Sequence, residues 1–328
     1  MNEITRRHWL TMMTAAAAIV APRWGHSADA WPNRPLRIVA GGAGSVTDIR
    51  ARWLGERLAA SLGQPVVVEN NAAAGGNLGA QQVARSPADG YTLLLIHQGT
   101  AAINPHLYPK LGFDPLTDFA PITRFGIGSL LLTVSSALPV RSVRELIALA
   151  RSKPGTLSYG TPGIGTPPHL ASELFTRMAG IEATHVPFKG GGALASAMLG
   201  GHVGFSMDGL TVQLPYVRSG QLHALGVTGA RRTASMPDIP TIAETGLPGY
   251  EFSGWTGFAA PSGTPKDIIS RLNADIAKIA ATPEARAWFD VGGADAGIQS
   301  PDAFGEFIRA EHSKWGQVVR DAGIRIEG

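Results

Sequence analysis

The sequence predicts an α/β fold built on a mainly parallel sheet with helices on both faces. Two observations lead to this prediction: short, continuous apolar runs recur along the chain, and segments with a helical spacing of apolar residues separate them. Strands that are apolar throughout are typical of a parallel sheet covered on both faces. The alternation restarts near residue 143, which suggests a second domain. The chain is long enough for two modest domains.

The expected elements follow this alternation along the chain. Leu170, Leu174 and Met178 are predicted to form the core-facing stripe of one helix. A last helix begins at Ser300-Pro301, and Phe304, Ile308, Trp315 and Val319 are expected to form its buried stripe. Strands are expected at 36–39, 65–69, 91–96, 157–159, 184–188, 203–207 and 224–227, and further helices at 49–62, 143–150, 193–199 and 214–218.

Residues 1–30 have the order of a secretory signal peptide. Arg6-Arg7 precede a mildly apolar stretch, and Ala28-Asp29-Ala30 supplies small residues for cleavage. The apolar stretch is shorter than the roughly 20 residues that a membrane span requires. The arginine pair resembles the twin-arginine export pattern, with an ordinary Sec signal as the alternative. We expect a periplasmic protein that is cleaved near Ala30.

Charge and cysteine content exclude several classes of protein. Removal of residues 1–30 takes away three arginines and two carboxylates, so the formal net charge of +3 becomes +2. No basic run follows the signal, and nucleic acid is therefore not an expected partner. The chain has 0 cysteines, which rules out disulfides and thiolate chemistry.

Two glycine-rich stretches each lead into an amphipathic helix. Residues 40–48 follow the first apolar run, and residues 159–169 precede the helical pattern at 170–178. A strand that turns through glycines into a helix leaves N–H groups unpaired at the positive end of the helix dipole. Such a turn binds anions readily. Two of them, in different halves of the chain, predict a cleft that holds a small anion from both sides.

No complete catalytic pattern accompanies these turns. Residues 42–47 lack the final glycine of a dinucleotide fingerprint, and Lys189 precedes its glycines, the reverse of a P-loop. Asp208 stands where a nucleophile elbow requires glycine. The histidines include no pair with the helical spacing of a zinc enzyme, so neither metal nor cofactor is expected.

Three charged or polar residues near the turns have ordinary structural interpretations. His169 is interpreted as a polar group bonded to the loop backbone, with a general base as the alternative. Asp48 is interpreted as a carboxylate that caps free N–H groups at a helix start, with acid–base work as the alternative. Arg50, like Arg52, is interpreted as ordinary helix surface.

The mature chain resembles receptors of the tripartite tricarboxylate transporter family, extracytoplasmic solute-binding proteins that are also called Bug proteins. The likeness covers nearly the whole mature chain, and no single motif carries it alone. The motifs are, in order, WPNRPLRIV (31–39), GQPVVVEN (63–70), AGGNLG (74–79), PADGYTLL (87–94), NPHLY (104–108), DFAPI (118–122), HVPFKG (185–190), PDIPT (237–241), GLPGY (246–250) and APSGTP (260–265).

The resemblance implies a periplasmic-binding-protein fold of the second type, in which two chain segments cross between two domains. Domain one would comprise residues 31–130 plus 252–328, and domain two residues 131–251. The crossovers would lie at 130–134 and 251–255. The partners implied are a small carboxylate between the domains and the permease subunits of a membrane transporter, and a monomer is expected.

The expected ligand-binding residues lie on the two glycine-rich turns and on strand ends near them. In this chain Gly41 replaces the family's usual loop aromatic, and Phe188 stands where tyrosine is frequent, so no particular substrate can be transferred. The expected residues are Gly44, Ser45, Val46, Thr47, Asp48, Gln98, Thr100, Thr161, Gly165, Thr166, His169, Phe188 and Asp208.

The favoured function is capture of a small organic carboxylate and its delivery to a membrane transporter. One alternative is an exported carboxylate-processing hydrolase that uses His169 with Ser45 or Asp208. Another is a ligand sensor for a signalling partner. The missing catalytic set argues against the hydrolase, whereas transport and sensing differ only in the partner.

Replacement of Arg6 and Arg7 by lysine tests the export route. The twin-arginine route reads the arginine pair itself, so precursor should accumulate in the cytoplasm, as fractionation and immunoblotting would show. A variant with both arginines kept and Arg23→Lys is the matched control and should be exported normally. Undiminished export of the double-lysine variant would assign the chain to the Sec route.

Overall fold

The structure is a computed structural model that describes residues 31–322. The chain from Arg34 onward forms the compact unit described below. The expected signal segment, residues 1–30, lies outside the described residues. No helix within 31–322 is long and apolar enough to cross a membrane.

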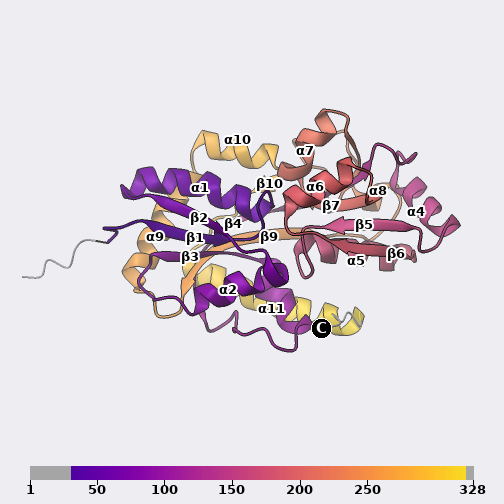
Figure 1. Ribbon diagram of the computed structural model, residues 1–328. Helices are drawn as coiled ribbons and strands as arrows, with labels where there is room; N and C mark the ends of the chain where they lie inside the picture. The colour runs from indigo at the N-terminus through magenta and orange to yellow at the C-terminus, as the bar shows by residue number, and fades with distance from the viewer. Residues whose placement is uncertain (1–30, 323–328) are drawn as a thin grey trace, which may run out of the picture. The chain divides into compact units, whose positions relative to one another are not determined.

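Ten strands are linked by backbone hydrogen bonds in the order β2-β1-β3-β9-β4-β7-β5-β6, and β8 and β10 also pair with β4 (Figure 1). Each pair that includes β4 or β9 is antiparallel, and the other pairs, β1 with β2 and β3, and β5 with β6 and β7, are parallel. The strands are β1 (Leu36–Ala40), β2 (Val66–Asn70), β3 (Thr92–His97), β4 (Phe119–Ser135), β5 (Leu157–Thr161), β6 (Ala183–Pro187), β7 (Phe205–Gly209), β8 (Leu222–Val227), β9 (Ser253–Pro261) and β10 (Ala294–Asp295).

Strand β4 joins two groups of strands. Its first part, from Phe119 to Ser129, pairs with β9, which continues through β3 to β1 and β2. Its second part, from Leu130 onward, pairs with β7 and β8. The apolar run 130–134, expected to be a crossover, is therefore the segment of β4 where its partners change.

Helices cover both faces of each group of strands, as the alternating pattern predicts. Figure 1 shows α1 and α10 on one side of the β1–β3 group and α2 and α11 on the other, with α6 and α7 opposite α5 around β5–β7. The main helices are α1 (Val46–Leu62), α2 (Asn77–Ala84), α4 (Val143–Ser152), α5 (Pro167–Ala179), α6 (Gly191–Leu199), α7 (Leu210–Arg218), α9 (Lys266–Ala280), α10 (Pro283–Val291) and α11 (Pro301–Ala322). Shorter helical turns are η1 (Ala73–Gly76), η2 (Gly99–Ile103), α3 (Asn104–Leu107) and α8 (Ile242–Thr245).

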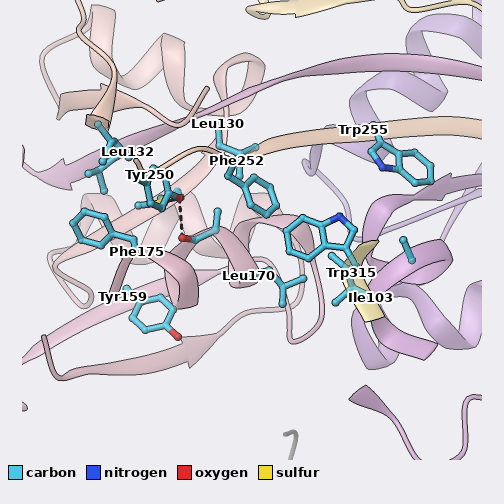
Figure 2. Close-up of a cluster of buried hydrophobic side chains, with 14 of the residues drawn as sticks. Ile103, Leu130, Leu132, Tyr159, Leu170, Phe175, Tyr250, Phe252, Trp255 and Trp315 are labelled. Carbon is cyan, nitrogen blue, oxygen red and sulfur yellow. Dashed lines mark hydrogen bonds between the residues drawn. The ribbon is translucent and has the colours of Figure 1, made fainter. Parts of the chain in front are cut away.

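A large aromatic core fills the space between the strands and these helices (Figure 2). Tyr250 is buried there, and its hydroxyl donates a hydrogen bond of 2.9 Å to the Ala171 carbonyl of α5. Phe175 and Trp255 have exposed fractions of 0% and 1%. The bond matters because an unpaired hydroxyl in such a core would lose its hydration without compensation.

The two predicted helix stripes have different outcomes. Phe304, Ile308, Trp315 and Val319 of α11 are all buried, which confirms the stripe of the last helix. The stripe on α5 is wrong at its end, because Met178 is 40% exposed. The two prolines start α5 earlier than the apolar spacing indicated, and its buried side chains include Ala171 and Phe175 instead.

Candidate functional site

The first glycine-rich turn ends at a capped helix start. Ser45 has an extended backbone (φ −78°, ψ 165°), and its side chain accepts a hydrogen bond from the Asp48 N–H. Gly44 has φ 71°, a conformation that favours glycine. The N–H groups of Val46 and Thr47, in the first turn of α1, have no hydrogen-bond partner among the described residues. This turn therefore has free donors at the positive end of a helix.

Asp48 holds this turn in place and is not itself free. Its carboxylate accepts hydrogen bonds from the Gly44 N–H (2.9 Å), Arg52 Nε (2.8 Å) and Asn70 Nδ2 (2.8 Å). Asn70 also donates to the Gly41 carbonyl (2.7 Å), which ties the turn to the end of β2. Asp48 thus accepts an N–H of the turn just before the helix, whereas the N-cap of α1 is Ser45.

The part of the second glycine-rich turn that lines the cavity has few free donors. The Thr166 N–H and hydroxyl both donate to the Gly163 carbonyl, and the Gly165 N–H donates to His169 Nδ1. Pro167 and Pro168, the first two residues of α5, have no N–H at all. The first turn therefore presents more free N–H groups to the cavity, and the expectation that both turns hold the ligand stays a prediction.

His169 serves this turn as a hydrogen-bond acceptor. Its ring stacks on His185, with 4.2 Å between centroids, and burial lowers the pKa of both imidazoles to about 4. Both rings are therefore neutral near pH 7, which His169 requires in order to accept the Gly165 N–H at 3.2 Å. The loop-bonded interpretation of His169 describes these contacts.

A cavity lies where the two turns, β4, β7 and β9 meet. The volume open to the centre of a water-sized sphere is about 80 Å³. By the same measure one water molecule needs roughly 10–15 Å³. This is room for a small organic acid. The lining residues are Gly41, Gly42, Ser45, Val46, Thr47, Arg50, Ala72, Gly75, Gly76, His97, Gly128, Ser129, Leu130, Pro162, Thr166, Pro167, Pro168, Asp208, Gly209, Leu210, Thr211, Gly254, Trp255, Thr256 and Gly292.

Glycines let the chain segments around the cavity approach at backbone distance. A Cβ added at Gly42 would lie 2.6 Å from the Gly190 Cα, and one at Gly191 would lie 2.4 Å from the Gly44 oxygen. A Cβ at Gly75 would lie 2.1 Å from the Ile164 oxygen. Any larger side chain at these positions would force the segments apart.

The structure brings five of the expected site residues to the cavity and leaves the others outside its lining. The first group comprises Ser45, Val46, Thr47, Thr166 and Asp208. The second comprises Gly44, Asp48, Gln98, Thr100, Thr161, Gly165, His169 and Phe188. Ligand contact by any of these residues stays a prediction.

The second group is engaged in the surrounding fold. Gln98 donates to the Ser253 carbonyl and to Glu311, and the Thr100 hydroxyl donates to the His97 carbonyl. Thr161 is hydrogen-bonded to His185 Nε2 at 2.7 Å. Phe188 packs against the small cluster around Leu194. These partners come from distant segments, which the linear sequence does not reveal.

Arg50 is the cavity residue that sequence reasoning misjudged. Far from being ordinary helix surface, its side chain is buried, with the residue 8% exposed, and it lines the cavity. Its Nη1 donates to Thr256 Oγ1 (2.7 Å) and to the Gly126 carbonyl (3.4 Å). Burial lowers the pKa of the guanidinium to about 10, so it stays charged at neutral pH.

Asp208 is the only carboxyl that lines the cavity. It is 1% exposed, its Oδ1 accepts the Gly209 N–H at 2.7 Å, and its Oδ2 has no partner in the described structure. Burial raises the pKa of this carboxyl to about 7, against the smaller opposing effect of the Gly209 hydrogen bond.

The cavity has no metal-binding or catalytic set. Within residues 31–322, no three histidine, aspartate or glutamate side chains gather closely enough to hold a metal ion. The hydrolase alternative pairs His169 with Ser45 or Asp208, but His169 does not line the cavity and its Nδ1 is occupied.

Sequence comparison matches residues 50–324 to the family model described as tripartite tricarboxylate transporter family receptor. Protein BugT of Bordetella pertussis is 36% identical over 315 residues, covering 95% of this chain and 96% of that protein. A protein from the tcbD-tcbE intergenic region of a Pseudomonas strain is 34% identical over 293 residues, covering 89% and 87% of the two chains.

Solved structures of the same size superpose on nearly all of the chain. Rpa4515 of R. palustris, solved with adipate, has a TM-score of 0.87 and 37% identity, covering 90% of this chain and all (100%) of that one. The periplasmic binding protein BugD has a TM-score of 0.86 and 31% identity over 90% and 100% of the chains. MatC of Rhodopseudomonas palustris, solved with malate, has a TM-score of 0.84 and 32% identity over 88% and 100%.

The pKa of Asp208 predicts how stability depends on pH. Because this pKa is raised in the folded state, the native protein binds a proton between about pH 4 and 7 that the unfolded chain has lost, so this group makes stability fall as pH rises through that window. Asp208→Asn should remove the fall. The variant should gain on the order of 2–3 kcal/mol relative to wild type between pH 5 and pH 8.

Urea unfolding of both proteins at unit pH steps measures this difference. Asp238→Asn is the control, because Asp238 lies on the exposed surface. A constant difference between Asp208→Asn and wild type from pH 5 to pH 8 would contradict a raised pKa at Asp208.

Proposed function

Because the chain belongs to the tripartite tricarboxylate transporter receptor family, we propose that it captures a small organic carboxylate in the cavity and delivers it to the permease subunits of a membrane transporter. The family membership confirms the resemblance drawn from the sequence motifs. The superposed structures confirm the α/β periplasmic-binding-protein fold. The family consists of solute-binding receptors and not of enzymes.

The single observation that carries the proposed ligand class is the pair of free N–H groups at the start of α1. Val46 and Thr47 line the cavity, and their donors are unpaired at the positive end of a helix of 17 residues. A carboxylate would satisfy both. That two relatives were solved with adipate and with malate supports the same class.

The proposed location follows from the family and from residues 1–30. The family is one of periplasmic binding proteins. Export through the twin-arginine route with cleavage near Ala30 remains our proposal, and the arginine pair of the signal supports it. We expect the mature protein to act as a monomer.

We propose two domains, residues 31–130 plus 252–328 and residues 131–251, that close over the ligand. The change of β4 partners at Leu130 supports this boundary. The backbone contacts of Gly42 with Gly190, and of Gly44 with Gly191, would then join the domains at the edge of the cavity. A ligand that binds better to the closed arrangement shifts the population toward it.

Val46→Pro tests the ligand site. Proline is favoured at the first position of a helix, and the extended Ser45 is compatible with a following proline, so α1 should form normally. Calorimetry should first identify a ligand among mono-, di- and tricarboxylates and acidic amino acids, recovered chemically unchanged. Loss of one N–H bond to its carboxylate should then weaken binding about tenfold.

Val46→Ala is the matched control, because it removes the side chain and keeps the N–H. The proposal requires that Val46→Pro bind more weakly than Val46→Ala. Equal affinities would show that the N–H groups of the α1 start do not bind the ligand. Failure of every acid to bind the folded wild-type protein would contradict the proposed function.

Gly191→Ala tests closure. Gly191 lies outside the cavity lining and its φ is not positive, but an added Cβ would lie 2.4 Å from the Gly44 oxygen, across the contact that would join the two proposed domains. Gly192→Ala is the control, since its Cβ would meet only the Ala43 oxygen at 3.6 Å. We expect Gly191→Ala alone to weaken ligand binding, by about tenfold for a cost of ~1.4 kcal/mol.

X-ray scattering of the ligand-saturated proteins supplies the second readout. Gly191→Ala should stay more expanded than wild type, and Gly192→Ala should not. Identical affinity and identical compaction for both variants would contradict closure at this contact.

A further inference from the structure

The charge balance of the cavity bears on which acids it can hold. Its lining has one fixed cation, Arg50, and one carboxyl, Asp208. His97 also lines it, but burial lowers the pKa of that imidazole to about 4, so the ring is neutral at pH 7. The cavity therefore holds a positive charge near neutral pH, balanced at most in part by Asp208.

Arg50 lacks a carboxylate partner. No aspartate or glutamate of the described chain lies within 4 Å of its guanidinium, and only Nη1 is hydrogen-bonded. The Nε and Nη2 groups have no hydrogen-bond partner within residues 31–322. Neither is among the fully buried atoms that lack a partner, so both keep contact with solvent. A buried cation without a counter-charge is costly, so its open donors point to an anionic ligand.

The fold makes space for this guanidinium. A Cβ on Gly126, whose φ is 107°, would lie 2.3 Å from Arg50 Cζ, so only glycine leaves room for the flat group there. Arg50 follows Val46 by four residues and shares its face of α1. Side chains on a helix lean toward its N-terminus, which directs Arg50 toward the turn with the free N–H groups.

The opposite wall of the cavity holds a carboxyl, Asp208, and no fixed cation among the described residues. Thr166 uses its N–H and its hydroxyl on Gly163, and Pro162, Pro167 and Pro168 lack N–H groups. Apolar side chains of Leu130, Leu210 and Trp255 line the cavity as well, beside the hydroxyl-bearing Ser129 and Thr211. A second carboxylate placed there would lose hydration without meeting a cation and would lie in the same cavity as Asp208.

We propose that the cavity selects monocarboxylates, with Arg50 and the first turn of α1 binding the single carboxylate and the apolar wall packing the rest of the molecule. This inference rests on the proposed function and narrows its ligand class. It differs from the ligands named for two relatives, adipate and malate.

Two matched series test the selection by calorimetry at pH 7.5: hexanoate, adipate and hexanamide, and benzoate, terephthalate and benzamide. In at least one series the monoacid should bind at least tenfold more tightly than the diacid of the same length and than the uncharged amide. A diacid that binds as tightly as its monoacid, or more tightly, would overturn the inference and leave the proposed function intact.

Arg50→Gln tests the residue. It removes the charge and keeps an amide donor, and it should lower monoacid affinity at least tenfold and bring acid and amide to similar affinities. Arg50→Lys keeps the charge but loses the planar guanidinium, so its monoacid affinity should lie between those of wild type and Arg50→Gln. Arg271→Gln is the matched control, because Arg271 is an exposed cation paired with Asp275 on α9.

Thermal unfolding without ligand separates binding from a structural role. Removal of an uncompensated buried cation should leave the melting temperature of Arg50→Gln unchanged or higher, while affinity falls. Unchanged monoacid affinity in folded Arg50→Gln would overturn the role of Arg50. If no carboxylate in either series, nor malate, citrate or glutamate, binds the wild-type protein, the proposed function itself fails.

Discussion

The pairing of β4 on both edges is the constraint on which the cavity depends. Phe119 to Ser129 pair with β9, whereas Leu130 to Val134 pair with β7. Since a strand in the interior of a sheet must bond its backbone groups on both sides, the two groups of strands cannot shift along β4 independently. Gly128, Ser129 and Leu130 line the cavity at the point where the partners change.

The two glycine-rich turns around this point look alike in sequence and differ in chemistry. The first is held by Asp48 and Asn70 at its edge, which leaves the Val46 and Thr47 donors free. At the cavity, the second presents prolines and Thr166, whose N–H and hydroxyl both bond within the turn. The difference arises because a helix start binds an anion only through N–H groups that nothing else occupies.

Burial of ionisable groups decides the remaining chemistry of the cavity. Arg50 keeps its charge although burial lowers its pKa, and Asp208 loses part of its charge because burial raises its pKa to about 7. His97, with a pKa lowered to about 4, is neutral. The cavity thus attracts a small anion while its walls stay mostly apolar, a combination that favours specificity through shape as well as charge.

The sequence by itself determined the α/β class, the α11 stripe and the family, because these depend on local spacing and on motifs in order. It also placed Ser45, Val46 and Thr47 on a turn that reaches the cavity. Only the tertiary structure decided that Arg50 is buried and lines the cavity, because its partners Gly126 and Thr256 lie 76 and 206 residues away in the sequence. Burial and hydrogen-bond occupancy are set by such distant neighbours, so no local pattern could distinguish Arg50 from the exposed Arg52, or the donor-rich turn from the donor-poor one.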